Sequence, residues 1–316
     1  MRPVVSGLVL FALLVLAGCE LEEITIVEVE DVVIAEVHVQ IGTGLFGRNR
    51  VTAFLHRTVG GAGPGLHDVP GASITVTRNS SASYEFGPTA IETCVGSTPE
   101  GGTGSCYWVA PAAAADFRPG EALELVIELP SGGTLQSATT VPGDFALKGV
   151  GEGEQCLLAP ATPLTVAWTP SLGTWAYINE TTLIGIRAAL EPVGIQVDDD
   201  PLYLLGLSIT ANDTTIVFPG EFGVFNRFEL DHDLAATLQE GLPAGTRAPV
   251  SISAADRNYV NWVRGGSFNP SGQVRVPSVR GDGTGVFAAV VVRTFEVVVS
   301  PDSAGAAYEV PTCPTT

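Results

Sequence analysis

The residues of this chain best able to do chemistry are its histidines and carboxylates, since these types carry out acid–base catalysis and bind metal ions. The four histidines, His38, His56, His67 and His232, lack the spacing of a metal-ligand pair. The sequence has no G-x-S-x-G nucleophile elbow, no HExxH and no phosphate-binding glycine loop followed by lysine. It therefore predicts no catalytic residue, no metal ligand and no cofactor, and we expect His38 to face solvent.

Two acidic clusters could still attract a hard cation. They are Asp198-Asp199-Asp200 and Asp231-His232-Asp233, and neither fits the calcium loop of an EF-hand, which supplies six or more oxygen ligands. A surface loop or a helix cap is the expected role of each, with calcium binding as the alternative. A pair of catalytic carboxylates distant in sequence, as in glycoside hydrolases, stays open among the 34 acidic residues.

Glycine and aromatic motifs point to structure rather than to ligand binding. Residues 281–285 read Gly-Asp-Gly-Thr-Gly and lead into a β-branched run, whereas a nucleotide-binding loop opens a helix. The segment therefore predicts a turn with positive φ. Tyr107, Trp108, Tyr259 and Trp262 could form platforms for sugars or peptides, but packing in a core or interface is the expected use of each.

The N-terminus has the plan of an export signal. Arg2 precedes an apolar run over residues 8–16, and Leu16-Ala17-Gly18-Cys19 resembles the bacterial lipobox. We therefore expect residues 1–18 to be a cleaved signal peptide and Cys19 to be the lipid attachment site, diacylated (palmitate or similar). The acidic residues 20–23 resemble the surface-export signals of some lipoproteins. An ordinary signal peptide or an uncleaved helix is the alternative.

Four cysteines remain once Cys19 is acylated, and an even number in an exported chain predicts two disulfides. Spacing alone permits three pairings. Cys94–Cys106 is favoured because the glycine-rich segment between the two closes easily, and Cys156–Cys313 follows by elimination. A metal site is the alternative, although CxxC spacing is absent.

Composition limits the class of protein. The chain has 316 residues, 45% hydrophobic content, 37 glycines and 22 prolines, which suits two domains of short strands joined by turns. Its formal charge of −19 becomes one unit more negative when Arg2 leaves with the signal. Such a charge argues against nucleic acid and against an electrostatic membrane patch, so the lipid must provide the anchor.

Alternating apolar residues predict an all-β fold of two tandem antiparallel β-sandwiches of the immunoglobulin-like kind. The first set of strands is expected near residues 33–41, 51–58, 72–76, 84–86, 106–109, 122–129 and 135–141. The second is expected near residues 164–168, 175–178, 183–190, 203–209, 214–218, 222–225 and 286–299. The periodicity lapses over residues 149–163, which predicts a domain boundary.

The expected division is a signal (1–18), an acidic tether (19–31), an N-terminal sandwich (32–157), a C-terminal sandwich (158–305) and a tail (306–316). Two short helices interrupt the second sandwich. One runs from Asp231 or Asp233 to about Gln239, and the other is capped by Ser253 and ends at Gly265. Trp168 and Tyr177 are expected in the second core.

The order of short motifs resembles an uncharacterised family of two-domain outer-membrane lipoproteins of the Bacteroidota type, associated with TonB-dependent transporters. The matching pieces are the lipobox and residues 69–76, 117–120, 140–143, 253–263 and 283–287. The resemblance implies a surface or periplasmic component linked to such a transporter. No functional residue can be carried over, and the four cysteines after Cys19 are not part of the pattern.

Together these features predict an outer-membrane lipoprotein, periplasmic or surface-exposed, that acts as a non-enzymatic binding or accessory module for an envelope or transporter complex. The alternatives are an envelope hydrolase resembling a glycosidase and a carbohydrate-binding or adhesive surface protein. A polar pocket with perturbed carboxylates would favour the enzyme.

Overall fold

The computed structural model describes residues 30–42, 48–60, 63–95, 103–208, 210–218, 232–264, 276–301 and 311–314. The expected signal peptide, Cys19, the tether as far as residue 29, the strand at 222–225 and most of the tail lie outside these residues. The chain from Asp31 onward forms one compact unit. Among the described residues, no helix has both the length and the apolar character needed to cross a membrane.

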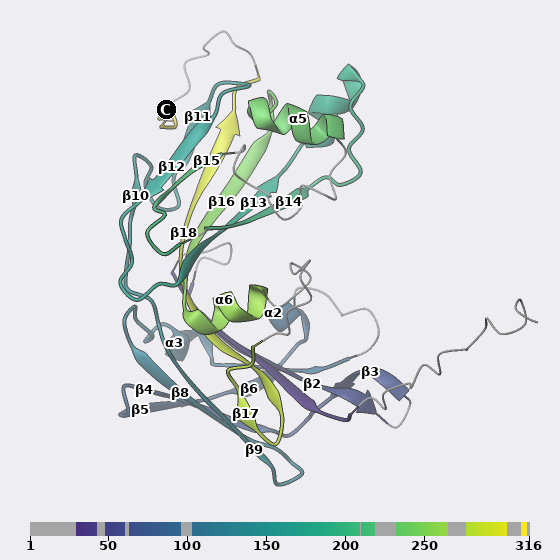
Figure 1. Cartoon of the computed structure of the whole chain (residues 1–316), viewed down its shortest axis with the longest axis vertical. Coiled ribbons are helices and arrows are strands. Elements are labelled where there is room, and N and C mark those ends of the chain that lie inside the picture. The colour runs from purple at the N-terminus through teal and green to yellow at the C-terminus, as the bar shows by residue number, and fades with distance from the viewer. Residues whose placement is uncertain are drawn as a thin grey trace, which may run out of the picture. The chain divides into compact units, whose positions relative to one another are not determined.

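The largest sheet has ten strands and contains residues from both halves of the chain (Figure 1). Its strands in spatial order are β14 (Leu202–Leu207), β13 (Ala176–Leu183), β16 (Arg247–Ala255), β18 (Thr284–Val299), β1 (Val33–Gly42), β2 (Arg50–Gly60), β7 (Ser105–Trp108) and β6 (Gly87–Thr89). Two further strands pair off this path, β11 (Gln155–Leu158) with β18 and β3 (Gly63–Asp68) with β2.

Two smaller sheets and several short helices complete the described fold. One sheet has the order β17 (Arg280–Gly281), β9 (Thr134–Thr140), β8 (Ala122–Glu128), β4 (Ser73–Arg78) and β5 (Ala82–Glu85). The other has β10 (Leu147–Lys148), β12 (Leu164–Trp168) and β15 (Thr215–Phe218). The helices are α2 (Glu92–Val95), α3 (Pro111–Ala114), α4 (Ile186–Leu190), α5 (His232–Glu240) and α6 (Arg257–Arg264), with a 3₁₀ turn η1 (Glu191–Val193).

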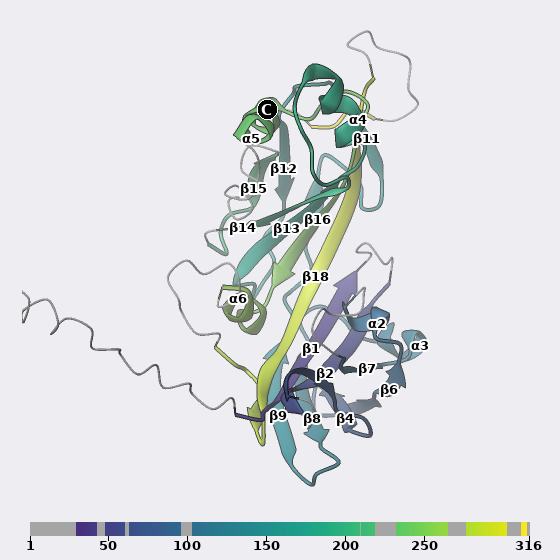
Figure 2. The same cartoon turned by 90° about the vertical axis from the view of Figure 1, so that its right-hand side faces the viewer.

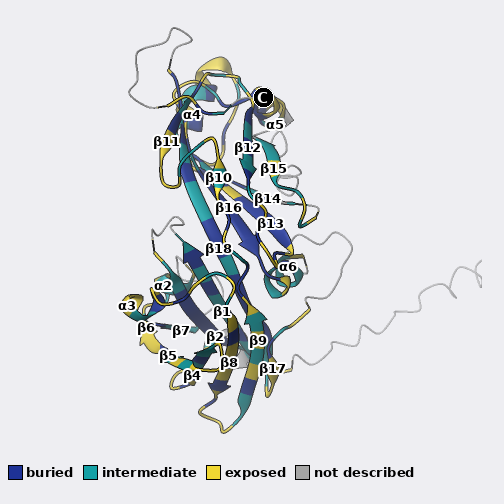
Figure 3. Cartoon of the chain, turned by 90° about the vertical axis from the view of Figure 1, so that its left-hand side faces the viewer, coloured by how far each residue is buried: buried dark blue, intermediate teal, exposed yellow. Residues whose placement is uncertain are grey.

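Each small sheet packs its apolar face onto the large one, which confirms the expected all-β architecture of tandem sandwiches. In β1 every second residue is buried, and these residues share a core with the buried positions of β8 and β4. In the C-terminal half, Trp168 of β12 meets Tyr177 of β13 with 5.1 Å between ring centroids, so both are core residues as expected. Figure 3 shows the buried stretches of β13 and β16 between more exposed loops.

β18 belongs to both sandwiches, and the sheet therefore does not divide at residues 157 and 158. Residues 284–292 pair in parallel with β1, and residues 290–298 pair antiparallel with β16 (Figure 2). β17, also from the C-terminal half, pairs with β9. The lapse in periodicity near residues 149–163 marks a connection along the chain, but it cannot indicate which sheet a later strand joins. The parallel pairings β1–β18 and β11–β18 also depart from the expected purely antiparallel sheets.

Glycine permits the close approach of β1 and β18. A Cβ atom at Gly285 would lie 2.0 Å from the carbonyl oxygen of Ala35, and one at Gly42 would lie 2.2 Å from that of Val292. Gly281 and Gly285 have φ values of 128° and 143°, so the predicted turn with positive φ is confirmed.

The helices agree with the sequence in part. α5 and α6 occupy the two expected places, but the cap of α6 is Asp256, because Ser253 lies within β16. The strand expected at 183–190 is wrong beyond Leu183. There the carboxylate of Asp200 accepts the backbone N–H groups of Gly185 at 2.9 Å and Arg187 at 3.1 Å, and these hydrogen bonds favour the start of α4.

Candidate functional site

A polar groove of about 250 Å³ lies on the face of the large sheet where β18 passes from one sandwich to the other. We call it the sheet groove. Five adjacent strands form its floor and α6 lies against β18 at its side (Figure 1). It is lined by His38, Gln40, Arg50, Ile178, Glu180, Ser251, Ser253, Tyr259, Val290 and Val292.

Strand alternation explains why these residues meet. Side chains two positions apart point to the same face of a strand, so the face of β1 opposite the N-terminal core presents His38 and Gln40. Cross-strand pairing then aligns Gln40 with both Val290 and Arg50. The floor is consequently apolar along β18 and polar along the strands beside it.

Asp256 fixes the position of α6 beside the groove. One carboxylate oxygen of Asp256 accepts the backbone N–H of Tyr259 at 2.7 Å, and the other accepts the hydroxyl of Thr139 on β9. The amide of Asn258 donates to the carbonyl oxygens of Ala138 at 3.1 Å and Phe287 at 2.9 Å. α6 is thereby fastened to strands of both the large and the five-stranded sheet. Burial raises the pKa of Asp256 to about 6, although the hydrogen bonds from Thr139 and Tyr259 oppose this shift.

His38 and Tyr259 meet edge to face across the groove. Their ring centroids are 5.8 Å apart and their planes differ by 72°. Burial, followed by the positive charge of Arg50, lowers the pKa of His38 to about 4, so the imidazole is neutral at pH 7. His38 lies on the strand face that the sequence predicted, but it is only partly exposed, because Tyr259 of α6 packs against its ring on that face. Burial also raises the pKa of Tyr259, helped by the negative charges of Glu180 and Asp256.

The groove holds one carboxylate and one guanidinium on separate strands. Glu180 of β13 keeps surface accessible to solvent, yet protein surrounds enough of its carboxyl group for desolvation to raise its pKa. Desolvation likewise lowers the pKa of Arg50 on β2. Both pKa shifts mean that the charged form is less favourable than in water. This is expected where an ionisable group lies in a recess and is incompletely solvated.

This set of side chains suits recognition of a polar ligand. The neutral imidazole, amide, hydroxyl and phenol groups supply donors and acceptors, and the two charged groups add electrostatic contacts. Within the part of the chain that the structure describes, no three histidine, cysteine or acidic side chains are grouped so as to hold a metal ion.

A second recess, of about 390 Å³, is less suited to a ligand. It is lined mainly by apolar and proline residues, and its charged members are Arg57 and Asp68. Arg57 already forms a bidentate ion pair with Asp31, with nitrogen–oxygen distances of 2.9 and 2.6 Å.

The other candidate residues have structural roles. Tyr107 is buried and donates its hydroxyl to the carbonyl oxygen of Val69 at 2.7 Å, so it is a core residue. Asp200 of the first acidic cluster caps α4, as the loop-or-cap interpretation expected, and Asp233 of the second lies in the first turn of α5. Cys19 lies outside the described residues.

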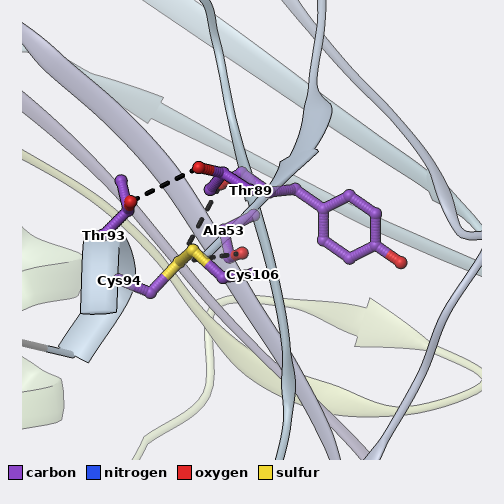
Figure 4. Close-up of a disulfide and its surroundings, with 6 residues drawn as sticks. Ala53, Thr89, Thr93, Cys94 and Cys106 are labelled. Carbon is purple, nitrogen blue, oxygen red and sulfur yellow. Dashed lines mark hydrogen bonds between the residues drawn. A yellow bond between two sulfur atoms is a disulfide. The ribbon is translucent and has the colours of Figure 1, made fainter. Parts of the chain in front are cut away.

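Both predicted disulfides are present. Cys94 of α2 joins Cys106 of β7 across 12 residues, and Cys156 of β11 joins Cys313 across 157. Figure 4 shows the first, with the Cys94 sulfur 3.4 Å from the carbonyl oxygen of Ala53, a contact in which the oxidised sulfur has no proton to donate. The second ties the C-terminal segment to β11, where the N–H of Cys313 also bonds the Leu157 carbonyl at 2.9 Å.

Sequence reasoning missed most of the groove. It assigned no functional role to Gln40, Arg50, Glu180 or Ser251, and it treated Ser253 as a helix cap. As possible functional residues it considered only His38 and Tyr259 among those that line the groove. A usable signal existed for β16, since apolar residues at 250, 252 and 254 alternate with two serines. The spacing of residues along the sequence does not indicate that five strands meet at one recess.

Comparison with known proteins identifies no family for this chain. No protein-family model and no curated protein matches the chain. Among solved structures, the FN1–FN3 domains of chicken CNTN1 align over 78% of this chain and 62% of their own length at 13% identity, with a TM-score of 0.18. This chain thus spans less than two thirds of that fragment. The fibronectin(III)-like modules of Clostridium thermocellum CbhA align over 87% of this chain and 96% of theirs at 9% identity, with a TM-score of 0.20. At such TM-scores neither likeness supports an inference about activity.

Proposed function

We propose that this protein is an outer-membrane lipoprotein, held by an acylated Cys19, that serves as a non-enzymatic binding or accessory module for a transporter or other envelope complex. The lipobox-like Leu16-Ala17-Gly18-Cys19 supports the anchor. The two disulfides support an oxidising compartment, where such bonds persist.

The sheet groove is the observation that carries the binding role. It combines an apolar floor on β18 with polar groups from four neighbouring strands and from α6. Because these strands pair in register and Asp256 fastens α6 beside them, the recess is formed before any ligand arrives. A preformed recess lowers the entropic cost of binding.

An envelope hydrolase is the second candidate, and one observation favours it. The raised pKa of Glu180 is the property expected of a general acid in a glycosidase. Glycoside hydrolysis needs two carboxyl groups about 5–9.5 Å apart, however. Glu180 is the single carboxylate among the described residues that line the groove. Recognition is therefore the better-supported role.

Replacement of the lipidated cysteine tests the proposal. A Cys19→Ser variant should leave the membrane fraction and appear in the soluble envelope fraction, and mass spectrometry of the wild type should find fatty acyl chains on the mature N-terminus. Glu20→Gln is the matched control and should stay with membranes. Unchanged fractionation of Cys19→Ser would contradict the proposal. Hydrolysis of an envelope polysaccharide by the wild type but not by Glu180→Gln would favour the enzyme instead.

A further inference from the structure

We propose that the sheet groove binds a primary amine on a short alkyl chain, with the ammonium group of the ligand held between Glu180 and Ser251. This inference rests on the binding role proposed above and names the class of ligand. Three observations carry it: a carboxylate with no cation beside it, a buried hydroxyl with no hydrogen-bond partner, and an apolar surface next to both.

Glu180 presents its carboxylate to the groove without a counter-charge. Among the described residues, no side chain donates a hydrogen bond to this carboxylate, and desolvation is the cause of its raised pKa. Arg50 lines the groove from β2, three strands beyond β16, and its charge does not contribute to that shift. A cation beside Glu180 would stabilise the ionised carboxylate, and the formal charge of −19 on the whole chain adds to the attraction.

Ser251 lies directly opposite Glu180 on the neighbouring strand β16. Opposite residues of an antiparallel pair have Cβ atoms about 4.5–5.5 Å apart on the same face of the sheet, and both of these residues line the groove. Ser251 is only 3% exposed, yet within the described part of the chain its hydroxyl makes no hydrogen bond. Because a buried hydroxyl without a partner is unfavourable, a donor on the ligand would be stabilising here.

Tyr259 of α6 supplies a third acceptor. Burial raises the pKa of its phenol, and the negative charge of Glu180 adds to this shift, so the two groups are near enough to interact. The phenol oxygen has no hydrogen-bond partner among the residues that the structure describes. A primary ammonium group carries three N–H donors, which match the carboxylate, the hydroxyl and the phenol oxygen. A neutral alcohol offers one donor and no charge.

The surface beside these acceptors is apolar. Ile178 lies two residues from Glu180 on β13, so both side chains are on the same face, and Val290 and Val292 of β18 continue the floor. Ile178, Tyr259 and Val290 also pack in one apolar cluster beside α6. The groove volume of about 250 Å³ is several times the share of one water in the liquid, about 30 Å³. It therefore has room for a few methylene groups behind the ammonium.

Calorimetric titration of the full chain in detergent, at pH 7 and constant ionic strength, tests the ligand class. The probes are n-butylamine, butan-1-ol, butyrate and the neutral disaccharide cellobiose, each to about 10 mM. n-Butylamine should bind at least about tenfold more tightly than any of the other three, because it alone places a cation beside Glu180.

The same ammonium group could belong to a free amine or to a lysine side chain of a peptide. Titration with Nα-acetyl-lysine amide distinguishes these sources. Weaker binding than that of n-butylamine assigns the groove to free amines, because the added backbone then does not fit. Tighter binding assigns it to a lysine side chain.

Variants locate the ammonium group. Glu180→Gln should weaken n-butylamine binding by about tenfold or more, and Ser251→Ala should weaken it by about fivefold through the loss of one hydrogen bond. Glu124→Gln on β8 and Ser73→Ala on β4 are matched controls at exposed strand positions outside the groove, and both should bind like the wild type. Glu124→Gln removes the same charge as Glu180→Gln, so it separates a local contact from the general attraction of an acidic chain.

Equal affinity of the wild type for n-butylamine and butan-1-ol would overturn the inference, and this comparison needs no variant. Wild-type affinity in Glu180→Gln, an equal loss in Glu124→Gln or tighter binding of cellobiose would also overturn it. Thermal unfolding of each variant establishes that it is folded before it is titrated. Fractionation of Cys19→Ser tests the proposed anchoring independently, so a failure of the amine assay and a failure of the membrane assay are distinguishable.

Discussion

The imidazole of His38 and the phenol ring of Tyr259 meet edge to face with centroids 5.8 Å apart, and this contact joins β1 to α6 across the sheet groove. One ring comes from the beginning of the chain and the other from its last third. The groove therefore depends on the large sheet and on α6 keeping their relative positions, which makes it sensitive to changes in the groups that hold them.

We expect His38 to reduce stability as the pH falls. Its pKa is about 4 when folded and about 6.5 when unfolded, so between these values the unfolded chain binds a proton that the native state excludes. From pH 7 to pH 5 the wild type should lose about 1–2 kcal/mol of unfolding free energy relative to His38→Gln. Urea denaturation at both pH values measures the difference. Tyr259→Phe, which keeps the ring beside His38, should retain the wild-type dependence, and parallel curves for wild type and His38→Gln would contradict the expectation.

Asp256, in contrast to His38, should increase the stability of the protein as the pH falls. Its pKa is about 6 in the folded chain against an unperturbed 3.8, so its contribution to stability is full below about 3.8 and is lost as the pH rises through 6. Between pH 7 and pH 4.5 the wild type should gain about 1–2 kcal/mol relative to Asp256→Asn. Thr139→Val removes a hydrogen bond that lowers this pKa and should move the midpoint to higher pH. An unchanged difference between wild type and Asp256→Asn over this range would refute the assignment.

Gly285→Ala should weaken the pairing of β1 with β18. The added Cβ would lie 2.0 Å from the carbonyl oxygen of Ala35, and φ at this position is 143°. The backbone must shift to avoid the clash, so we expect a loss of about 3 kcal/mol or more in unfolding free energy. Gly87→Ala is the control, because no atom lies within 4 Å of its added Cβ, and it should change stability by less than about 1 kcal/mol. Equal melting temperatures for the two variants would contradict the proposed clash between residue 285 and Ala35.

The two disulfides should differ in their contribution to stability. Chain entropy in the unfolded state predicts about 3 kcal/mol for the 12-residue separation of Cys94–Cys106 and about 5 kcal/mol for the 157-residue separation of Cys156–Cys313. Double serine variants of each pair, compared by denaturant unfolding, should therefore show the larger loss for the second pair. The reverse order would mean that local contacts outweigh chain entropy.

Much of the local structure follows from the sequence. The alternation of residues 33–41 predicts β1, and the apolar run at 286–299 predicts the long buried strand β18. The glycine-rich segment between Cys94 and Cys106 favours the observed pairing. These features depend on neighbours within one element or one short loop, so residue order is enough to specify them.

Other elements departed from the sequence pattern because of partners elsewhere in the chain. Residues 186–190 form α4 rather than a strand, since Asp200 satisfies the first backbone N–H groups of that segment. Ser253 lies within β16 because its backbone pairs with Ile178 and Val292, which leaves Asp256 to cap α6.

The sequence by itself determined where most of the strands form and which cysteines can close a short loop, and it led us to expect an export signal before the body of the protein. Only the tertiary structure decided that β18 pairs with β1 on one side and β16 on the other, and hence that Arg50 and Glu180 line the same groove. The reason is that a period-two pattern specifies the face of a strand but not its neighbour. The choice of neighbour depends on packing and loop closure over more than a hundred residues, which local spacing does not encode.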